Sequence, residues 1–154
     1  MSTAPHLSAL HTRLFQAKDE RKLSFNDIGQ KLGRDEVYVA AIFYGQAKPN
    51  DEELEGLSKV LNIPTAHLKD ELGSHFYPSR GGLTQMPPTD PTLYRFYEIL
   101  QVYGYPLKSV IHEKFGDGIM SAIDFSAKVD KVESEKGDRV KITLDGKFLP
   151  YAKW

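Results

Sequence analysis

The hydrophobic period of this chain changes once along its length, and that change limits what the chain can fold into. Up to about residue 73, apolar residues recur every three or four positions, as on one face of an amphipathic helix. Beyond residue 124 they alternate with polar residues, as in a strand with one buried face. A run of helices followed by a small sheet predicts an α+β fold.

The first part divides into five short helices. Residues that favour a helix start are followed at suitable distances by glycines that favour a helix end. The starts are Ser24, Asp35, Asn50 and Thr65, and the ends are Gly33, Gly45 and Gly73. We therefore expect a five-helix bundle over about residues 5–73. Its second and third helices have the lengths of a helix-turn-helix motif.

A segment without helical period separates the two parts. It is rich in proline and glycine, and we interpret residues 78–90 as a linker that wraps across a surface. The chain then divides into an N-terminal domain, 1–77, and a C-terminal domain, 91–154. The second domain is short, and units of this size bury a limited core and often need a partner. We expect a homo-oligomer in which the C-terminal domains pack together.

The C-terminal domain is predicted to hold two helices and a small antiparallel sheet. A proline suits the first turn of a helix, so we expect one helix over 91–104 and another over 106–115. Alternating segments follow, and Asp145-Gly146 is a strong signal for a tight hairpin before the last strand.

The helix-turn-helix pattern is compatible with a DNA-binding regulator that carries a C-terminal oligomerisation domain. A DNA reader places the start of its second helix against bases and phosphates. Here that start is Arg34-Asp35-Glu36, whose two carboxylates would repel phosphate. Residues 1–77 hold nine basic and eleven acidic side chains, so no basic surface surrounds the motif. We favour packing or dimerisation as the use of the bundle and keep DNA binding as the alternative.

Composition excludes several kinds of site. The chain has no cysteine, which removes disulfides, thiolate nucleophiles and zinc sites that need sulfur. His112-Glu113 begins like a zinc protease motif, but Gly116 stands where the second histidine belongs. A structural or surface role is favoured for all five histidines: His6, His11, His67, His75 and His112. No apolar run approaches a membrane span and the start of the chain does not resemble a secretory signal, so we expect a cytoplasmic protein.

Two features of the C-terminal domain are candidates for a functional site. Arg95 and Glu98, at spacing i, i+3, share one face of an aromatic-rich helix. They form either a surface ion pair or, if the helix is buried, an arginine site for a carboxylate-like anion. The glycines of residues 115–123 predict either a plain turn or a nest of backbone N–H groups that binds an anion. Ser121 would add a hydroxyl donor, although no histidine–acid pair accompanies it.

Three segments of the C-terminal domain resemble the cyanases, also called cyanate hydratases or cyanate lyases. They are Asp90–Glu98 with Leu100–Gly104, His112–Ile123 and Leu144–Pro150. The resemblance is dense across residues 90–150 and looser over the N-terminal bundle. It implies an enzyme in which bicarbonate attacks cyanate. The adduct would lose carbon dioxide and leave carbamate, which falls apart to ammonia and a second carbon dioxide.

The same resemblance implies which residues act. The family's catalytic arginine, glutamate and serine fall on Arg95, Glu98 and Ser121, and substrate-binding positions fall on Arg95, Ser121, Ala122 and Leu149. No metal or cofactor is implied, and bicarbonate is a co-substrate. Arg95 would offset the repulsion between two small anions, and Ser121 would hold a negative atom. Glu98 would orient Arg95 or pass a proton.

The resemblance further implies a decamer, a ring of five dimers, with active sites shared between subunits. Its N-terminal bundle would be lambda-repressor-like in fold without binding DNA. We expect cyanate and bicarbonate as the partners, with no nucleic acid and no membrane.

Overall fold

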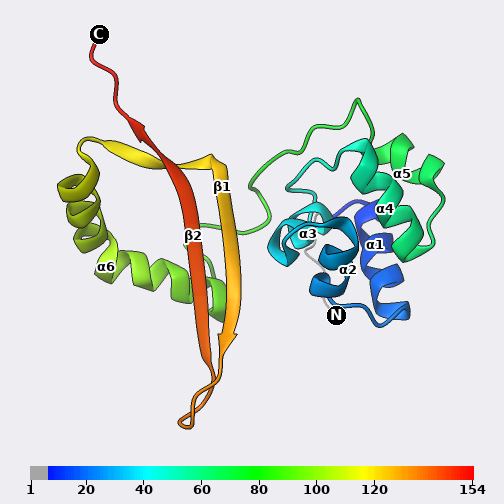
Figure 1. Ribbon diagram of the computed structural model, residues 1–154, viewed down its shortest axis with the longest axis horizontal. Coiled ribbons are helices and arrows are strands. Elements are labelled where there is room, and N and C mark those ends of the chain that lie inside the picture. Colours follow the sequence, from blue (N-terminus) through cyan, green and yellow to red (C-terminus); the bar gives the residue numbers. More distant parts are fainter. Residues whose placement is uncertain (1–6) are drawn as a thin grey trace. The chain divides into compact units, whose positions relative to one another are not determined.

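The computed structural model describes residues 7–154, so His6 lies outside the described residues. Five short helices come first, followed by one long helix and two strands (Figure 1). They are α1 (Ala9–Glu20), α2 (Phe25–Leu32), α3 (Glu36–Phe43), α4 (Asp51–Leu61), α5 (Thr65–Leu72), α6 (Pro91–Phe115), β1 (Gly118–Val132) and β2 (Arg139–Pro150). This order confirms the predicted α+β fold.

Backbone contacts divide the chain into two compact units. The first holds α1–α5, runs to Leu83 and includes Lys128–Ile142. The second holds α6 and consists of Thr84–Ala127 with Thr143–Trp154. The predicted linker, residues 78–90, contains neither helix nor strand.

Local hydrogen bonds set the ends of the short helices. Ser24 Oγ accepts the Asp27 amide at 3.0 Å, and the Ser24 amide donates to Asp27 Oδ2 at 2.9 Å, which makes a capping box at the start of α2. The prediction for α5 is wrong, because Pro64 occupies its N-cap position and no side chain caps it. Thr65 is already helical, and its hydroxyl donates to Ser58 Oγ at 2.9 Å.

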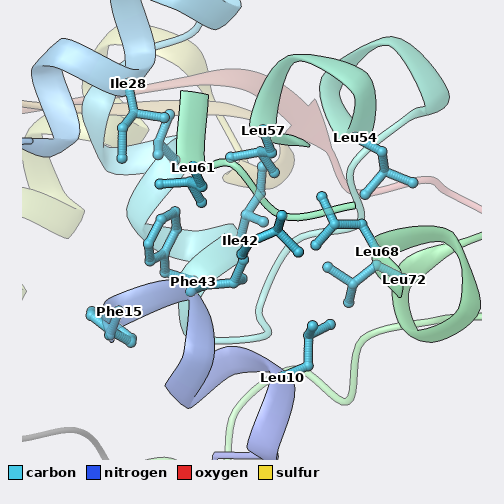
Figure 2. Close-up of a cluster of buried hydrophobic side chains, with 13 residues drawn as sticks. Leu10, Phe15, Ile28, Ile42, Phe43, Leu54, Leu57, Leu61, Leu68 and Leu72 are labelled. Carbon is cyan, nitrogen blue, oxygen red and sulfur yellow. The ribbon is translucent and has the colours of Figure 1, made fainter. Parts of the chain in front are cut away.

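The hydrophobic core lies inside the five-helix bundle. Apolar side chains from different helices point toward one another there (Figure 2). The rings of Phe15 and Phe43 meet edge to face, with centroids 5.3 Å apart. Full burial of a leucine or isoleucine contributes about 1.5–3 kcal/mol, so this set can hold the bundle together by itself. The buried apolar residues are Leu10, Leu14, Phe15, Ile28, Val39, Ile42, Phe43, Leu54, Leu57, Leu61, Ile63, Leu68 and Leu72.

Residues 91–115 form one helix rather than the two predicted. Asp90 caps α6 with its side chain, and Pro91 occupies the first turn. Pro106 lies inside the helix, where it removes one backbone hydrogen bond without ending the helix. Figure 1 shows α6 changing direction part-way along its length, as an internal proline favours.

β1 and β2 form a two-stranded antiparallel hairpin that turns at residues 133–138. The prediction of a tight turn at Asp145-Gly146 is wrong, because both residues lie inside β2. A Cβ at Gly146 would meet the carbonyl oxygen of Ser121, so glycine is needed there for the close approach of β1. Gly137, with φ of +114°, takes the left-handed conformation in the actual turn.

The long helix exposes much apolar surface. No residue of α6 is buried, and most positions of both strands are exposed as well. A two-stranded hairpin is too narrow to cover a helix of this length, so these elements do not complete a core within one chain. No described helix is long and apolar enough to cross a membrane. The exposed apolar side chains of α6 are Leu93, Tyr94, Phe96, Ile99, Leu100, Val102, Tyr103, Tyr105, Leu107, Val110 and Phe115.

Candidate active site

Arg95 and Glu98 lie one helical turn apart near the start of α6. Arg95 Nη1 is 3.7 Å from Glu98 Oε1, which is the distance of a loose ion pair. The side chains are 72% and 40% exposed, respectively. A pair this open to water is weak, and most of the donors of the guanidinium stay available for another anion.

The aromatic residues around this pair do not bury it. The rings of Tyr94 and Tyr97 lie beside each other, with centroids 5.8 Å apart. Tyr94 itself is exposed, as is Phe96 on the same helix. Of the two interpretations of this pair, the described chain shows the surface ion pair, because no residue of α6 is buried. The apolar side chains of α6 are present, but they are exposed in the described chain.

Ser121 lies on β1 and has a very different environment. The residue is only 4% exposed, and its Oγ accepts two backbone amides, from Ile123 at 3.0 Å and from Asp124 at 2.9 Å. A hydroxyl has two acceptor lone pairs and one proton. With both lone pairs facing amides, the hydroxyl proton is the part left to bind a further group, and that group must be an acceptor.

The later residues of the segment 115–123 do not form the predicted anion nest. β1 already begins at Gly118, so that part of the segment is strand. The amides of Ile123 and Asp124 point at Ser121 Oγ instead of an open concavity. Sequence reasoning missed these two residues. The signal that could have found them is the serine itself, because a Ser hydroxyl often bonds backbone amides a few residues further along the chain.

The remaining predicted binding residues lie on the strands. Ala122 is an exposed residue of β1, and Leu149 is a 41% exposed residue of β2. A Cβ at Gly118 would meet the Leu149 carbonyl oxygen, so the two strands pass very close here. Ser121, Ala122 and Leu149 thus share one end of the hairpin, the end that holds the start of β1.

The structure does not join this end of the hairpin to the ion pair on α6. Within residues 7–154, Ser121 makes no hydrogen bond to Arg95 or Glu98. The chain therefore presents the three predicted catalytic residues on two elements, α6 and β1, without a hydrogen bond between them. One element offers a guanidinium and a carboxylate, and the other offers a hydroxyl donor.

Among residues 7–154, the histidines and carboxylates form no cluster of three or more groups that could hold a metal ion. His112 Nδ1 lies 2.9 Å from the Gly116 carbonyl oxygen at the end of α6, and His67 Nδ1 lies 3.2 Å from Arg13 Nη1. Both contacts are structural.

The cation beside the helix-turn-helix is paired with a carboxylate of the same bundle. Arg34, the cation at the turn before α3, donates Nε–H to Glu53 Oε2 at 2.8 Å. This hydrogen bond and the charge of Glu53 raise the pKa of Arg34. A phosphate at the start of α3 would meet Asp35 and Glu36 beside an arginine that already has a carboxylate partner.

Comparison with known proteins decides between an enzyme and a DNA-binding protein. The family model described as the cyanate lyase C-terminal domain matches residues 85–153. A cyanate hydratase of Coprinopsis cinerea is 55% identical over 97% of this chain and 99% of its own length. The chain belongs to the cyanate hydratase family.

Other cyanate hydratases match equally well along the whole chain. One from Prochlorococcus marinus is 56% identical and covers 99% of both sequences. The crystal structure of a cyanase from T. urticae, at 37% identity, superimposes with a TM-score of 0.78 and covers 92% of this chain and 97% of its own. Cyanate hydratases are carbon–nitrogen lyases, so the chain is an enzyme of that class. Nothing in these comparisons supports the DNA-binding alternative.

Proposed function

We propose that this chain decomposes cyanate in a reaction that consumes bicarbonate. The observation that carries the proposal is its match to cyanate hydratases over nearly its whole length. Bicarbonate oxygen would attack the cyanate carbon, and the adduct would release carbon dioxide and leave carbamate. Carbamate then gives ammonia and a second carbon dioxide. With the two protons that the reaction takes up, one cyanate and one bicarbonate balance one ammonia and two carbon dioxide molecules.

Arg95, Glu98 and Ser121 are our candidates for the catalytic residues. Two anions at contact distance repel each other, and the repulsion grows as water is excluded. A guanidinium fork such as that of Arg95 offsets this repulsion and fixes the orientation of both anions. Fixing two reactants at attack distance can contribute roughly 7–11 kcal/mol to barrier reduction. We assign Arg95 this role.

Ser121 fits the role of a hydrogen-bond donor better than that of a nucleophile. Its lone pairs face the Ile123 and Asp124 amides, so its proton is directed to an acceptor such as a substrate oxygen or nitrogen. Glu98 repels anions by itself and lies beside Arg95. We therefore assign it either the orientation of the guanidinium or the transfer of a proton. Ala122 and Leu149, at the same end of the hairpin, would line the substrate position.

We also propose that the active site is assembled from more than one subunit. Two observations support this proposal: α6 has no buried residue, and no hydrogen bond joins Ser121 to Arg95 or Glu98 within the described chain. Packing of copies through α6 and the hairpin would cover the apolar side chains and bring the two groups together. By family resemblance we expect a ring of five dimers. The reaction as written needs no metal or cofactor, and we expect the enzyme in the cytoplasm.

The deciding experiment measures ammonia release from cyanate by the purified full-length chain, with and without added bicarbonate. We expect release that depends on both anions, and a particle mass ten times that of the 17.4 kDa chain. Ammonia release that is indifferent to bicarbonate in carbonate-free buffer would contradict the mechanism. Absence of any release would contradict the proposed substrate.

Mixed oligomers test the shared site. Arg95→Ala and Ser121→Ala chains are purified separately, mixed, dissociated and reassembled. If Arg95 and Ser121 of one site come from different chains, some sites in the mixture regain both residues and activity returns. If both come from the same chain, the mixture stays as inactive as either variant alone.

A further inference from the structure

His11 is a buried histidine whose ring has a partner on only one side. The residue lies on α1 and is 7% exposed, and its Nδ1 is 2.7 Å from Ser8 Oγ. Its Nε2 is shielded from solvent and has no hydrogen-bond partner among residues 7–154. A Cβ on Gly45 would lie 3.3 Å from Nε2, so this nitrogen faces the turn after α3. A neutral ring tolerates this position, whereas a protonated ring would place an N–H there without an acceptor.

A segment that leaves α5 lies over this histidine. We call residues 74–83 the strap, since it is held to the bundle by three contacts. Lys48 Nζ donates to the carbonyl oxygen of Phe76 at 2.6 Å, and to that of Gly73, the residue before the strap, at 2.9 Å. The Gly81 amide donates to Gln46 Oε1 at 2.7 Å. The third contact is apolar, because the Phe76 ring lies beside the His11 ring with centroids 6.4 Å apart.

These contacts border an open pocket of about 330 Å³ between the strap and the bundle. His11 of α1 and its N-cap residue Ser8 line one side, and Tyr77 and Gly81 of the strap line another. The strap contributes none of the thirteen buried apolar residues of the core, although its Phe76 packs against that core as a partly buried side chain. Closure of the strap therefore depends on Phe76 and on its contacts around His11 and the α3–α4 loop, while the buried core itself is built from residues outside the strap.

Burial and a nearby negative charge shift the pKa of His11 in opposite directions. Burial lowers its pKa, and this is the larger effect, while the negative charge of Glu71 on α5 works to raise it. Tyr44, after α3, and Tyr77, on the strap, line the same pocket with phenols. Lys48 Nζ lies over the Tyr77 ring, 4.7 Å from its centroid, and adds a positive charge on the strap side. The neutral ring is thus the form that fits the closed strap.

We propose that the strap is an acid-sensitive latch that closes over neutral His11 and opens when His11 is protonated. Opening lets water reach the ring, so the open form binds the proton more readily than the closed form. Closure is therefore fully stable above the ordinary histidine pKa of about 6.5 and weakens as pH falls below it. The strap leads directly into Thr84, where the second unit begins. Each strap residue that opening frees would lengthen the connection between the bundle and the second unit by up to about 3.5 Å.

Hydrogen exchange of the full-length protein, followed by mass spectrometry from pH 8 to pH 5, tests the proposal. Each rate is divided by that of an unstructured reference peptide at the same pH. The Gly81 amide reports closure directly, because its acceptor is Gln46 on the bundle. We expect strap peptides to lose protection below about pH 6.5, by at most about tenfold per pH unit, the limit for one proton. Peptides from α4 should keep their protection.

Two histidine variants make the test specific. His11→Gln removes the titrating group and should leave strap protection independent of pH. His67→Gln is the matched control, because His67 is exposed on the same bundle and should leave the wild-type profile unchanged. Strap protection that is independent of pH in the wild-type protein would overturn the proposal, as would a wild-type profile in His11→Gln.

A second substitution of His11 is needed because the strap could stay open at every pH in His11→Gln. His11→Phe keeps a ring beside Phe76 without a titrating group, and it should also give a flat profile. If the strap is unprotected at every pH in both His11→Gln and His11→Phe, the pH profile of the wild-type protein decides whether the proposal holds. A loss confined to the strap supports the latch, and a simultaneous loss in α5 contradicts it.

Discussion

The buried carboxylate of Glu53 accepts the hydroxyl proton of Tyr38 at 3.1 Å, which ties the first turn of α4 to α3. The same carboxylate, 4% exposed, accepts the Asn50 amide at 2.8 Å and is paired with Arg34. One side chain thus closes a capping box and satisfies two partners from the helix-turn-helix pair. The residues that would face DNA in a regulator are here held together by an internal hydrogen-bond network.

Loss of this carboxylate should destabilise the bundle strongly. Glu53→Ala leaves the Asn50 amide and the half-buried Tyr38 hydroxyl without this acceptor, so we expect the free energy of unfolding to fall by about 1–3 kcal/mol. Urea unfolding followed by circular dichroism measures it. Arg34→Ala is the control, since Arg34 is half-exposed and its removal leaves the Asn50 and Tyr38 hydrogen bonds in place, so we expect a clearly smaller loss. Equal losses in the two variants would mean that the ion pair, and not the buried hydrogen bonds, carries the effect.

Gly146 should be needed for the active site and not for the helical bundle. In Gly146→Ala the new Cβ would meet the Ser121 carbonyl oxygen and the Met120 side chain, so β1 must shift at the proposed donor. We expect ammonia release to fall at least about tenfold, since small misplacements of catalytic groups are costly. The matched control is Gly104→Ala inside α6, where a Cβ meets nothing within 4 Å. Wild-type activity in Gly146→Ala would show that Ser121 tolerates the shift.

The part of the fold that depends on local interactions could be predicted from the sequence. Ser24 and Asp27 form their capping box within four residues, and the periodic leucines pack inside one bundle. These interactions depend on short sequence separations, which capping rules and helical periodicity describe directly. The resemblance of residues 90–150 to cyanases identified the family for the same reason, since its motifs are contiguous.

The errors arose where distant residues override a local signal. Pro106 and Gly146 carry strong local preferences for a helix start and a turn, respectively. Pro106 is accommodated within α6, and Gly146 is required by the passage of β1. The exposure of Arg95 could not be decided from the sequence, because aromatic neighbours in sequence say nothing about whether this chain or another one covers them.

Arg95 should be required as an arginine and not merely as a cation. Arg95→Lys keeps the positive charge but loses the planar fork that can bind two oxygens at once. Loss of one hydrogen bond to a charged group costs about 1.5–3 kcal/mol, so we expect kcat/KM to fall by roughly 10- to 150-fold. The Arg95 side chain is largely exposed and is not one of the core residues, so circular dichroism and particle mass should not change. A lysine variant with wild-type kcat/KM would exclude bidentate binding.

Ser121 should act through its hydroxyl proton. Ser121→Ala removes the donor together with the acceptor of the Ile123 and Asp124 amides, and we expect kcat to fall by about 10²–10³, as for other donors to a developing negative charge. Ser121→Thr keeps the hydroxyl and separates the two effects. If the donor matters, threonine retains much more activity than alanine. If only the backbone turn matters, or the added methyl group disturbs the buried site, the two variants lose activity alike. Ser126→Ala, at an exposed position of the same strand, controls for loss of a serine in general. Full activity in Ser121→Ala would remove Ser121 from the site.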